Sequence, residues 1–224
     1  WKGLPLGGAK EFVDGYTNNP NMDFHTMVAD MANISRKQAK TINLGMMYGM
    51  GVRKLADQLD LEFEDAKELT QQYHSRVPFV KELMNGVSRS VDQKDDGSLR
   101  SLKGRKCRFD MFEPMGYDIQ KAMPLKEAKA TYGETAPLKR AYTYKALNRL
   151  IQASAADMTK QAMVDLYEAG ERPLLQVHDE LGCSVTSADH AKRIKQVMED
   201  AIRLHVPNKC DIDLGPSWGE TEEI

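Results

Sequence analysis

One spacing constrains the fold of this chain more than any other feature of its sequence. Arg36, Lys40, Leu44 and Tyr48 follow one another at steps of four residues. In an α-helix, each such step advances about 6 Å and turns only about 40° beyond a full circle. The spacing therefore predicts a helix that carries one stripe of two cations, an apolar group and an aromatic ring. Gly49 directly after the stripe predicts the end of this helix.

The chemistry of this stripe suits a nucleoside triphosphate laid along the helix. Arginine offers a planar fork and lysine a point charge to a polyphosphate, and an apolar group and a ring suit a sugar and a base. The alternative is structural, because cation pairs at this spacing commonly form a solvated face, and Leu44 with Tyr48 would commonly be core. A second motif favours the nucleotide interpretation: Gln-Val-His-Asp-Glu-Leu over residues 176–181.

Together, the two motifs resemble those of family A DNA polymerases, of the bacterial DNA polymerase I and phage replicative type. Arg36, Lys40, Tyr48 and Gly49 stand at the R-x3-K-x7-Y-G spacing of the second family motif, and residues 176–181 resemble the third. The resemblance extends from about Gly15 to the Gly-Pro-Ser-Trp-Gly-Glu stretch near the end of the chain. It implies template-directed DNA synthesis, in which two-metal phosphoryl transfer adds dNTPs to a primer 3′ end.

The resemblance also implies roles for individual residues. One set is expected to bind the dNTP: Arg36, Lys40, Leu44, Tyr48 and His25. Lys40 is also expected to be catalytic, with Asp179, Glu180 and His178 as the other catalytic residues. Acidic residues in hairpin turns are often only exposed turn residues. By the resemblance, however, Asp179 coordinates one or both of two Mg²⁺ ions, which prefer hard oxygen ligands, Glu180 is a secondary carboxylate and His178 positions the primer end.

A second set is expected to contact primer-template DNA: Asn148, Gln152, Arg105, Lys106 and Gly49. Asn148 and Gln152 resemble an N-x3-Q pair whose amides reach the minor groove, where every base pair offers acceptors. Arg105 and Lys106 belong to a basic hairpin predicted over residues 99–108, which would bind phosphates without sequence preference unless it is only a solvated charged loop. Many family members have arginine where this chain has Tyr144, and Lys145 is the candidate to replace that contact.

The predicted fold class is α/β, more narrowly a helix-rich α+β fold. It comprises fingers helices and part of the antiparallel palm sheet of a right-hand polymerase. Residues 1–22 are predicted to be a palm-to-fingers remnant, 23–137 the fingers and 138–224 the C-terminal palm.

Several local elements are also predicted within these segments. Asp23 and Ser35 are predicted N-caps. Helices are expected over residues 52–60, 63–76, 79–91, 138–169 and 187–206. Strands are expected on both sides of residues 178–180 and over residues 211–214. Residues 110–137 have little periodicity and are predicted to be a variable insertion or long loop.

Net charge, apolar content and cysteine spacing limit how this chain can bind DNA and where in the cell it can work. The net charge is −2, so overall basicity does not indicate nucleic acid, and DNA contacts must come from local patches. The sequence has no bilayer-spanning apolar run and no secretory signal. Its three cysteines lack metal-like spacing, which predicts a reduced, cytoplasm-like compartment. The family resemblance implies the cytoplasm of a bacterium or a phage-infected cell.

The first family motif, with its essential aspartate, has no counterpart in this sequence, and we expect it just before Trp1. The chain would then be a truncated fragment, or one half of a split polymerase that pairs with an N-terminal half. A single-subunit RNA polymerase shares the R-x3-K-x7-Y-G helix, but those enzymes resemble a His-Asp-Ser third motif, whereas Glu180 follows Asp179 here. The remaining alternative is a catalytically incomplete fragment that binds DNA or dNTP.

Overall fold

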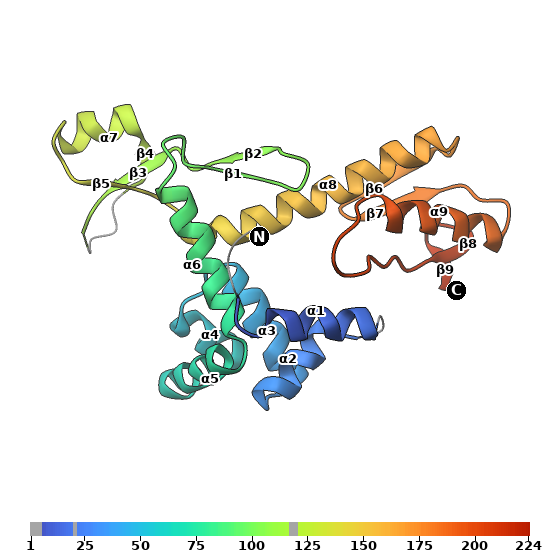
Figure 1. The fold of residues 1–224 in the computed structure, drawn as a ribbon, viewed down its shortest axis with the longest axis horizontal. Helices are drawn as coiled ribbons and strands as arrows, with labels where there is room; N and C mark the ends of the chain where they lie inside the picture. Colours follow the sequence, from blue (N-terminus) through green and yellow to red (C-terminus); the bar gives the residue numbers. More distant parts are fainter. Residues whose placement is uncertain (1–5, 20–21, 117–120) are drawn as a thin grey trace. The chain divides into compact units, whose positions relative to one another are not determined.

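Helices and small antiparallel sheets make up this protein (Figure 1). The computed structural model describes residues 6–19, 22–116 and 121–224. Part of the predicted remnant (1–5 and 20–21) and of the predicted variable segment (117–120) thus lies outside the described residues. The chain forms two compact units, one including Met22–Ile151 and the other Gln152–Ile224. The mixture of helices and antiparallel strands confirms the predicted fold class.

The first unit is built mainly from helices. Its helices are α2 (Phe24–Ala32), α3 (Arg36–Met47), α4 (Val52–Leu59), α5 (Phe63–Arg76) and α6 (Pro78–Asp92). The preceding helix α1 (Ala9–Asn18) is divided between the two units after Phe12. Both predicted N-caps are confirmed, since Asp23 accepts from the backbone N–H of His25 and Thr26, and Ser35 forms a capping box with Gln38. The fully buried side chains of this unit include Val28, Ile42, Leu55, Tyr73 and Val77.

The predicted basic hairpin is present in the first unit. Its strands are β1 (Ser98–Arg100) and β2 (Lys106–Arg108), and Leu99 faces Cys107 in the register. Leu99 and Phe109 are buried with Val87 and Val91 of α6, so the hairpin is anchored to that helix by an apolar cluster. The cationic side chains of the hairpin are left on the exposed side.

Of the two alternatives predicted for residues 110–137, a variable insertion or a long loop, the long loop is wrong for the described residues. The segment contains β3 (Met111–Pro114), β4 (Met123–Pro124) and α7 (Leu125–Tyr132). With β5 (Leu138–Arg140) the strands form a sheet of order β4-β3-β5. Strands this short carry too few residues to show a period of two, and they are specified by pairing with partners far along the chain. The described residues of this segment therefore form elements whose partners its own composition does not reveal.

The long helix predicted from residue 138 begins later. Residues 138–140 pair with β3, and a 3₁₀ turn, η1 (Thr143–Lys145), precedes α8 (Ala146–Glu168). Lys139 and Arg140 are therefore strand residues, and Tyr144 and Lys145 belong to the turn. The predicted helical start was wrong because a nonlocal strand partner overrides the local pattern.

The second unit contains most of α8 and two separate hairpins. The first pairs β6 (Pro173–Val177) with β7 (Glu180–Cys183), and α9 (Ala188–Asp200) follows. The second pairs β8 (Asp213–Ser217) with β9 (Glu220–Glu223), so the predicted final strand over 211–214 is displaced and a further strand follows it. Within the described residues, no helix is both long and apolar enough to cross a membrane.

The helix predicted over residues 187–206 ends early, at Asp200. The Nδ2 atom of Asn208 donates to the carbonyl oxygens of Glu199, at 3.2 Å, and Ile202, at 2.6 Å. These bonds occupy carbonyls at the helix end that would otherwise bond to a following turn of helix. The side chain of Asn208, which lies beyond the helix, therefore ends α9 at Asp200, although the apolar periodicity of the sequence continues.

Candidate functional site

The predicted stripe lies on the exposed face of α3. Arg36 and Lys40 are exposed, and the exposed fractions of Leu44 and Tyr48 are 44% and 54%. The opposite face of the helix is buried: Ala39, Ile42, Asn43, Gly45 and Met46. The exposure of Leu44 and Tyr48 excludes the structural alternative in which these two side chains are core. A continuous surface of two cations, an apolar group and a ring is thus available to a ligand.

Gly49 ends this surface, and two independent features require glycine there. Its backbone has a φ of +69°, which side-chain-bearing residues rarely adopt. A Cβ at this position would lie 2.6 Å from Cδ2 of Tyr144, on η1. Tyr144 therefore packs against the turn that follows α3, at the place where the resemblance leads one to expect arginine.

Lys145 does not extend freely from η1. Its Nζ lies 5.2 Å from the ring centroid of Tyr142 and 5.5 Å from that of Tyr144. A cation at these distances is attracted by the negative face of each ring. The cation next to Tyr144 is thus held over two exposed aromatic rings, and its role in replacing the arginine contact stays a prediction.

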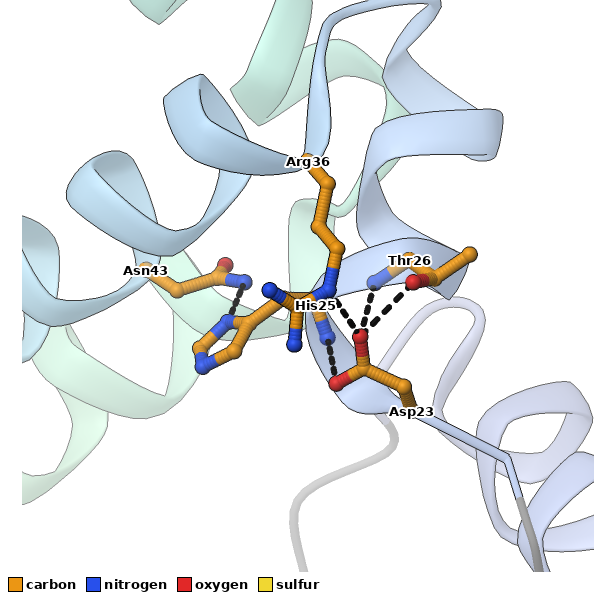
Figure 2. A network of polar contacts seen from close by, with 5 residues as sticks. All are labelled: Asp23, His25, Thr26, Arg36 and Asn43. Atoms are coloured by element: carbon orange, nitrogen blue, oxygen red, sulfur yellow. Dashed lines mark hydrogen bonds and ion pairs between the residues drawn. The ribbon is translucent and has the colours of Figure 1, made fainter.

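At the start of α3, Arg36 is ion-paired (Figure 2). Its Nε lies 2.6 Å from Oδ2 of Asp23, which also accepts from the hydroxyl of Thr26 at 2.7 Å. The hydrogen bond from Thr26 has the largest effect and the one from Arg36 the next. Together they hold the pKa of Asp23 well below its ordinary value. Since only Nε is engaged, the two terminal nitrogens of Arg36 have no partner among the described residues, and they form the fork that suits phosphate.

His25 belongs to a second polar chain beside the stripe (Figure 2). Its Nδ1 lies 3.1 Å from Nδ2 of Asn43, and Oδ1 of Asn43 accepts from the hydroxyl of Tyr73 at 2.7 Å. Burial lowers the pKa of His25, and so do the nearby charges of Arg36 and Lys40, against the opposite effect of Asp23. Burial and the two cations thus favour the neutral form of His25.

Sequence reasoning missed Asn43 and Tyr73. Asn43 is 1% exposed and the Tyr73 side chain is fully buried. The sequence did contain a signal for Asn43. Of the buried residues of α3, Asn43 is the one whose side chain can donate one hydrogen bond and accept another. Its partner could not be recognised, since Tyr73 lies on a different helix.

The predicted acidic residues lie at the β6–β7 hairpin of the second unit. Val177 pairs with Glu180, so His178 and Asp179 form the two-residue turn, and His178 has a φ of +53°. Asp179 is exposed, whereas Oε1 of Glu180 accepts from Nε1 of Trp218 at 2.8 Å. Trp218 thereby ties the β8–β9 turn to this hairpin. In the described part of the chain, no group of three or more His, Cys, Asp or Glu side chains could hold a metal ion.

Apart from Gly49, the predicted DNA-contacting residues lie on α8 and in the basic hairpin. Asn148 and Gln152 are one turn apart on α8, and Gln152 is exposed. Arg105 lies just before β2 and Lys106 begins it, with both side chains exposed. The Nζ of Lys106 is 2.6 Å from Oδ2 of Asp96, so part of its charge is already balanced.

Comparisons with known proteins converge on one family. The family model for DNA polymerase family A matches residues 7–220. A DNA-directed DNA polymerase of Pseudomonas phage M6 is 34% identical over 95% of this chain and 33% of its own length. DNA polymerase I of Geobacillus stearothermophilus is 29% identical over 92% of this chain and 22% of its own length.

A solved structure shares the fold. It is the POL domain of Pol1 from M. smegmatis in complex with DNA primer-template and dNTP, which matches with a TM-score of 0.65 and 27% identity. The match covers 87% of this chain and 34% of the solved chain. The chain thus spans about a third or less of the length of these relatives.

Proposed function

The chain belongs to DNA polymerase family A, and we propose that it acts in template-directed DNA synthesis by adding dNTPs to a primer 3′ end. The observation that carries this proposal is the exposed stripe of Arg36, Lys40, Leu44 and Tyr48 on α3. The phage relative is named a DNA-directed DNA polymerase, and the solved POL domain holds primer-template DNA and a dNTP. Both are consistent with a dNTP as the ligand of the stripe.

In this proposal, the stripe binds the dNTP from its phosphates to its base. Arg36, oriented through Nε by Asp23, directs its two terminal nitrogens to phosphate oxygens. Lys40, one turn further along, adds a point charge that offsets the negative charge developing on the leaving pyrophosphate. Leu44 and Tyr48 then contact the sugar and the base.

Magnesium is the cofactor that we propose for this chemistry. When bound, Mg²⁺ ions activate the primer 3′ hydroxyl and stabilise charge on the phosphates. The exposed carboxylate of Asp179 is a suitable hard ligand, while Glu180 is held by Trp218 and serves as the secondary carboxylate. Among the described residues, no group of three or more His, Cys, Asp or Glu side chains could hold a metal ion, so Asp179 is proposed as one ligand and not as a complete site. His178, in the turn with Asp179, is proposed to position the primer end.

We propose that the primer-template contacts come from α8 and the basic hairpin. The amides of Asn148 and Gln152 can donate to minor-groove acceptors present on every base pair, which favours contact without sequence preference. Arg105 and Lys106 can contact backbone phosphates. Gly49, at the end of the stripe beside Tyr144, is proposed as a further contact to the DNA.

A second candidate function is binding of dNTP and DNA without turnover. The observation that favours it is the incomplete set of metal ligands among the described residues. In that case, turnover would require an N-terminal polymerase half that supplies a further catalytic aspartate. The two candidates differ in whether this chain extends a primer alone, with a partner, or not at all.

Primer extension separates these possibilities. The 224-residue chain would be tested on primed DNA with Mg²⁺ and dNTPs, alone and with an N-terminal half of a family A polymerase. We expect extension that Asp179→Ala abolishes and that the control Asp189→Ala, in the exposed first turn of α9, retains. Absence of extension under every condition, with dNTP binding intact, would leave only the binding function.

Two lysine variants on α3 test the proposed nucleotide site. Lys40→Ala removes a cation of the stripe, whereas Lys37→Ala removes an exposed cation from another side of the same helix. We expect Lys40→Ala to weaken dATP binding about tenfold, as for a lost charge-assisted contact, and Lys37→Ala to have little effect. Equal effects of the two variants would indicate a general charge effect instead of a site.

A further inference from the structure

The polar chain from Tyr73 through Asn43 to His25 has a defined direction. The Tyr73 hydroxyl lies 2.7 Å from Oδ1 of Asn43 and is fully buried. Burial raises the pKa of this phenol, so it stays protonated. Within the described residues, Asn43 is its only hydrogen-bond partner. The Tyr73 O–H must therefore donate to Asn43, because otherwise its proton would have no acceptor in a buried site.

This direction determines which ring nitrogen of His25 carries the proton. With Oδ1 of Asn43 accepting from Tyr73, Nδ2 of Asn43 faces Nδ1 of His25 at 3.1 Å. An amide N–H can only donate, so Nδ1 must accept with its lone pair. The proton of the neutral imidazole then lies on Nε2. Turning the Asn43 amide over would reverse the assignment, but it would leave the buried Tyr73 proton without an acceptor.

The opposite side of the imidazole is available for a ligand. Figure 2 shows Nδ1 of His25 directed to Asn43 and the other ring nitrogen directed away from it. In the described structure, Nε2 of His25 has no hydrogen-bond partner. The charged groups that act on the ring are Asp23 beside it and Arg36 and Lys40 from α3. The two cations also make this region attractive to an anion.

The tautomer matters because phosphate oxygens are acceptors. Nε2–H of a neutral histidine donates to such an oxygen, whereas an unprotonated Nε2 would direct a lone pair at it. We propose that Tyr73 and Asn43 are positioning residues that hold His25 as its Nε2–H tautomer, so that it donates to a phosphate oxygen of a nucleoside triphosphate. This inference rests on the proposed function for the identity of its ligand, and on the described hydrogen bonds for the tautomer.

Nitrogen-15 NMR of the histidine rings tests the tautomer directly, without any activity. In the 224-residue chain, long-range ¹H–¹⁵N correlations distinguish protonated from unprotonated ring nitrogens, and His25→Gln assigns the signals. We expect unprotonated Nδ1 and protonated Nε2 for His25 near neutral pH. Asn43→Asp, which places an acceptor opposite Nδ1, should move the proton to Nδ1, while the signals of the other four histidines stay unchanged as an internal control.

Tyr73→Phe provides a second test if Asn43→Asp does not fold. It removes the donor that orients the Asn43 amide and keeps the ring that fills the core. The His25 signals should then report a mixture of tautomers. A protonated Nδ1 in the wild-type chain, or an unchanged single tautomer in Tyr73→Phe, would overturn the positioning role.

Binding of dATP and dAMP, measured by calorimetry, tests the ligand. Asn43→Asp and His25→Leu should each weaken dATP binding about tenfold, as expected for one hydrogen bond to a charged group, with dAMP affinity unchanged. His25→Gln, which keeps an N–H donor, should retain more of the affinity than His25→Leu. The expected tautomer without any dATP binding would overturn both the triphosphate contact and the proposed nucleotide site. The opposite tautomer with normal dATP binding would overturn the positioning role alone.

Discussion

At Gly49, both the backbone conformation and the close approach of Tyr144 favour a residue without a side chain. Its φ of +69° allows the chain to turn at the end of α3, and the absence of a Cβ lets the ring of Tyr144 approach. A β-carbon would strain the backbone and collide with the ring at once. The turn that bounds the proposed nucleotide surface therefore depends on one glycine.

We predict that Gly49→Ala destabilises the protein. The left-handed backbone alone costs about 1–2 kcal/mol for alanine, and displacement of Tyr144 adds to it. Gly51→Ser is the matched control, because Gly51 has a φ of −80°, nothing lies within 4 Å of an added Cβ, and serine is a favoured N-cap for α4. Urea denaturation should show a loss for Gly49→Ala only; equal stability of Gly49→Ala and wild type would contradict this account.

Asp23 should give the protein a pH-dependent stability. Its folded pKa lies below the ordinary aspartate value because Thr26 and Arg36 bond to the ionised form. The ionised carboxylate thus stabilises the fold above the unfolded pKa of about 4, and this contribution is lost as the pH falls from there towards the folded pKa.

Asp23→Asn tests whether the ionised carboxylate stabilises the fold. The variant should be less stable than wild type at neutral pH, and the difference should shrink as the pH falls below about 4. Urea denaturation at a series of pH values measures it, with the exposed Asp30→Asn on α2 as a control. A stability difference that does not change with pH would show that the charge of Asp23 is not what matters.

At the scale of elements, Arg140 links β5 to the turn before the basic hairpin. Its Nη1 donates to the carbonyl of Phe109 at 2.8 Å, and its Nη2 to that of Asp95 at 2.6 Å. Its guanidinium also lies 5.0 Å from the ring centroid of Phe112 on β3. One side chain thus bonds to carbonyls on both sides of the hairpin, before β1 and after β2, and holds them near the sheet.

Arg140→Met should therefore lower the stability of the protein by about 2 kcal/mol, because bonds from a charged donor to backbone carbonyls are lost. Lys139→Met is the control on the same strand. Its ion pair with the half-buried Glu113 has an N–O distance of 3.4 Å, and such pairs near the surface contribute at most about 1 kcal/mol. Thermal or urea denaturation compares the two, and a larger loss for Lys139→Met would refute the proposed link.

At the scale of the whole molecule, charge is distributed unevenly. The net charge is only −2, but residues 99–108 carry a local concentration of lysine and arginine. A protein that is acidic overall can still bind DNA when such a patch meets the phosphates, and each contact releases counterions. DNA binding by this chain should therefore be strongly salt-dependent.

The double variant Arg105→Gln/Lys106→Gln should weaken binding to primed duplex DNA and lower the slope of log K against log salt by about 2, near 0.9 per contact. Lys67→Gln/Lys195→Gln removes the same charge from two helices whose lysines are paired with glutamates. Fluorescence anisotropy over a salt series measures both slopes. Identical slopes for the two double variants would show that residues 105 and 106 make no phosphate contact.

Adjacent residues determined much of the first unit. The N-caps Asp23 and Ser35 and the start of α3 follow from side chains within a few positions of the backbone groups they satisfy. The bounds of α4 to α6 follow instead from local apolar periodicity and from Pro78 at the start of α6. The β6–β7 hairpin was predicted from the apolar residues on both sides of the turn, but Glu180, expected in the turn, begins β7. These features could be predicted because their causes are local in the chain.

Tertiary structure decided what the local pattern left open. It placed Leu44 and Tyr48 on the surface, paired residues 138–140 with β3 instead of adding them to α8, and ended α9 with the side chain of Asn208. It also brought Tyr73 to Asn43, 30 residues away along the chain. Strand pairing, burial and hydrogen bonds between distant side chains depend on which segments meet in space. Only the fold could therefore show how His25 is held beside the stripe.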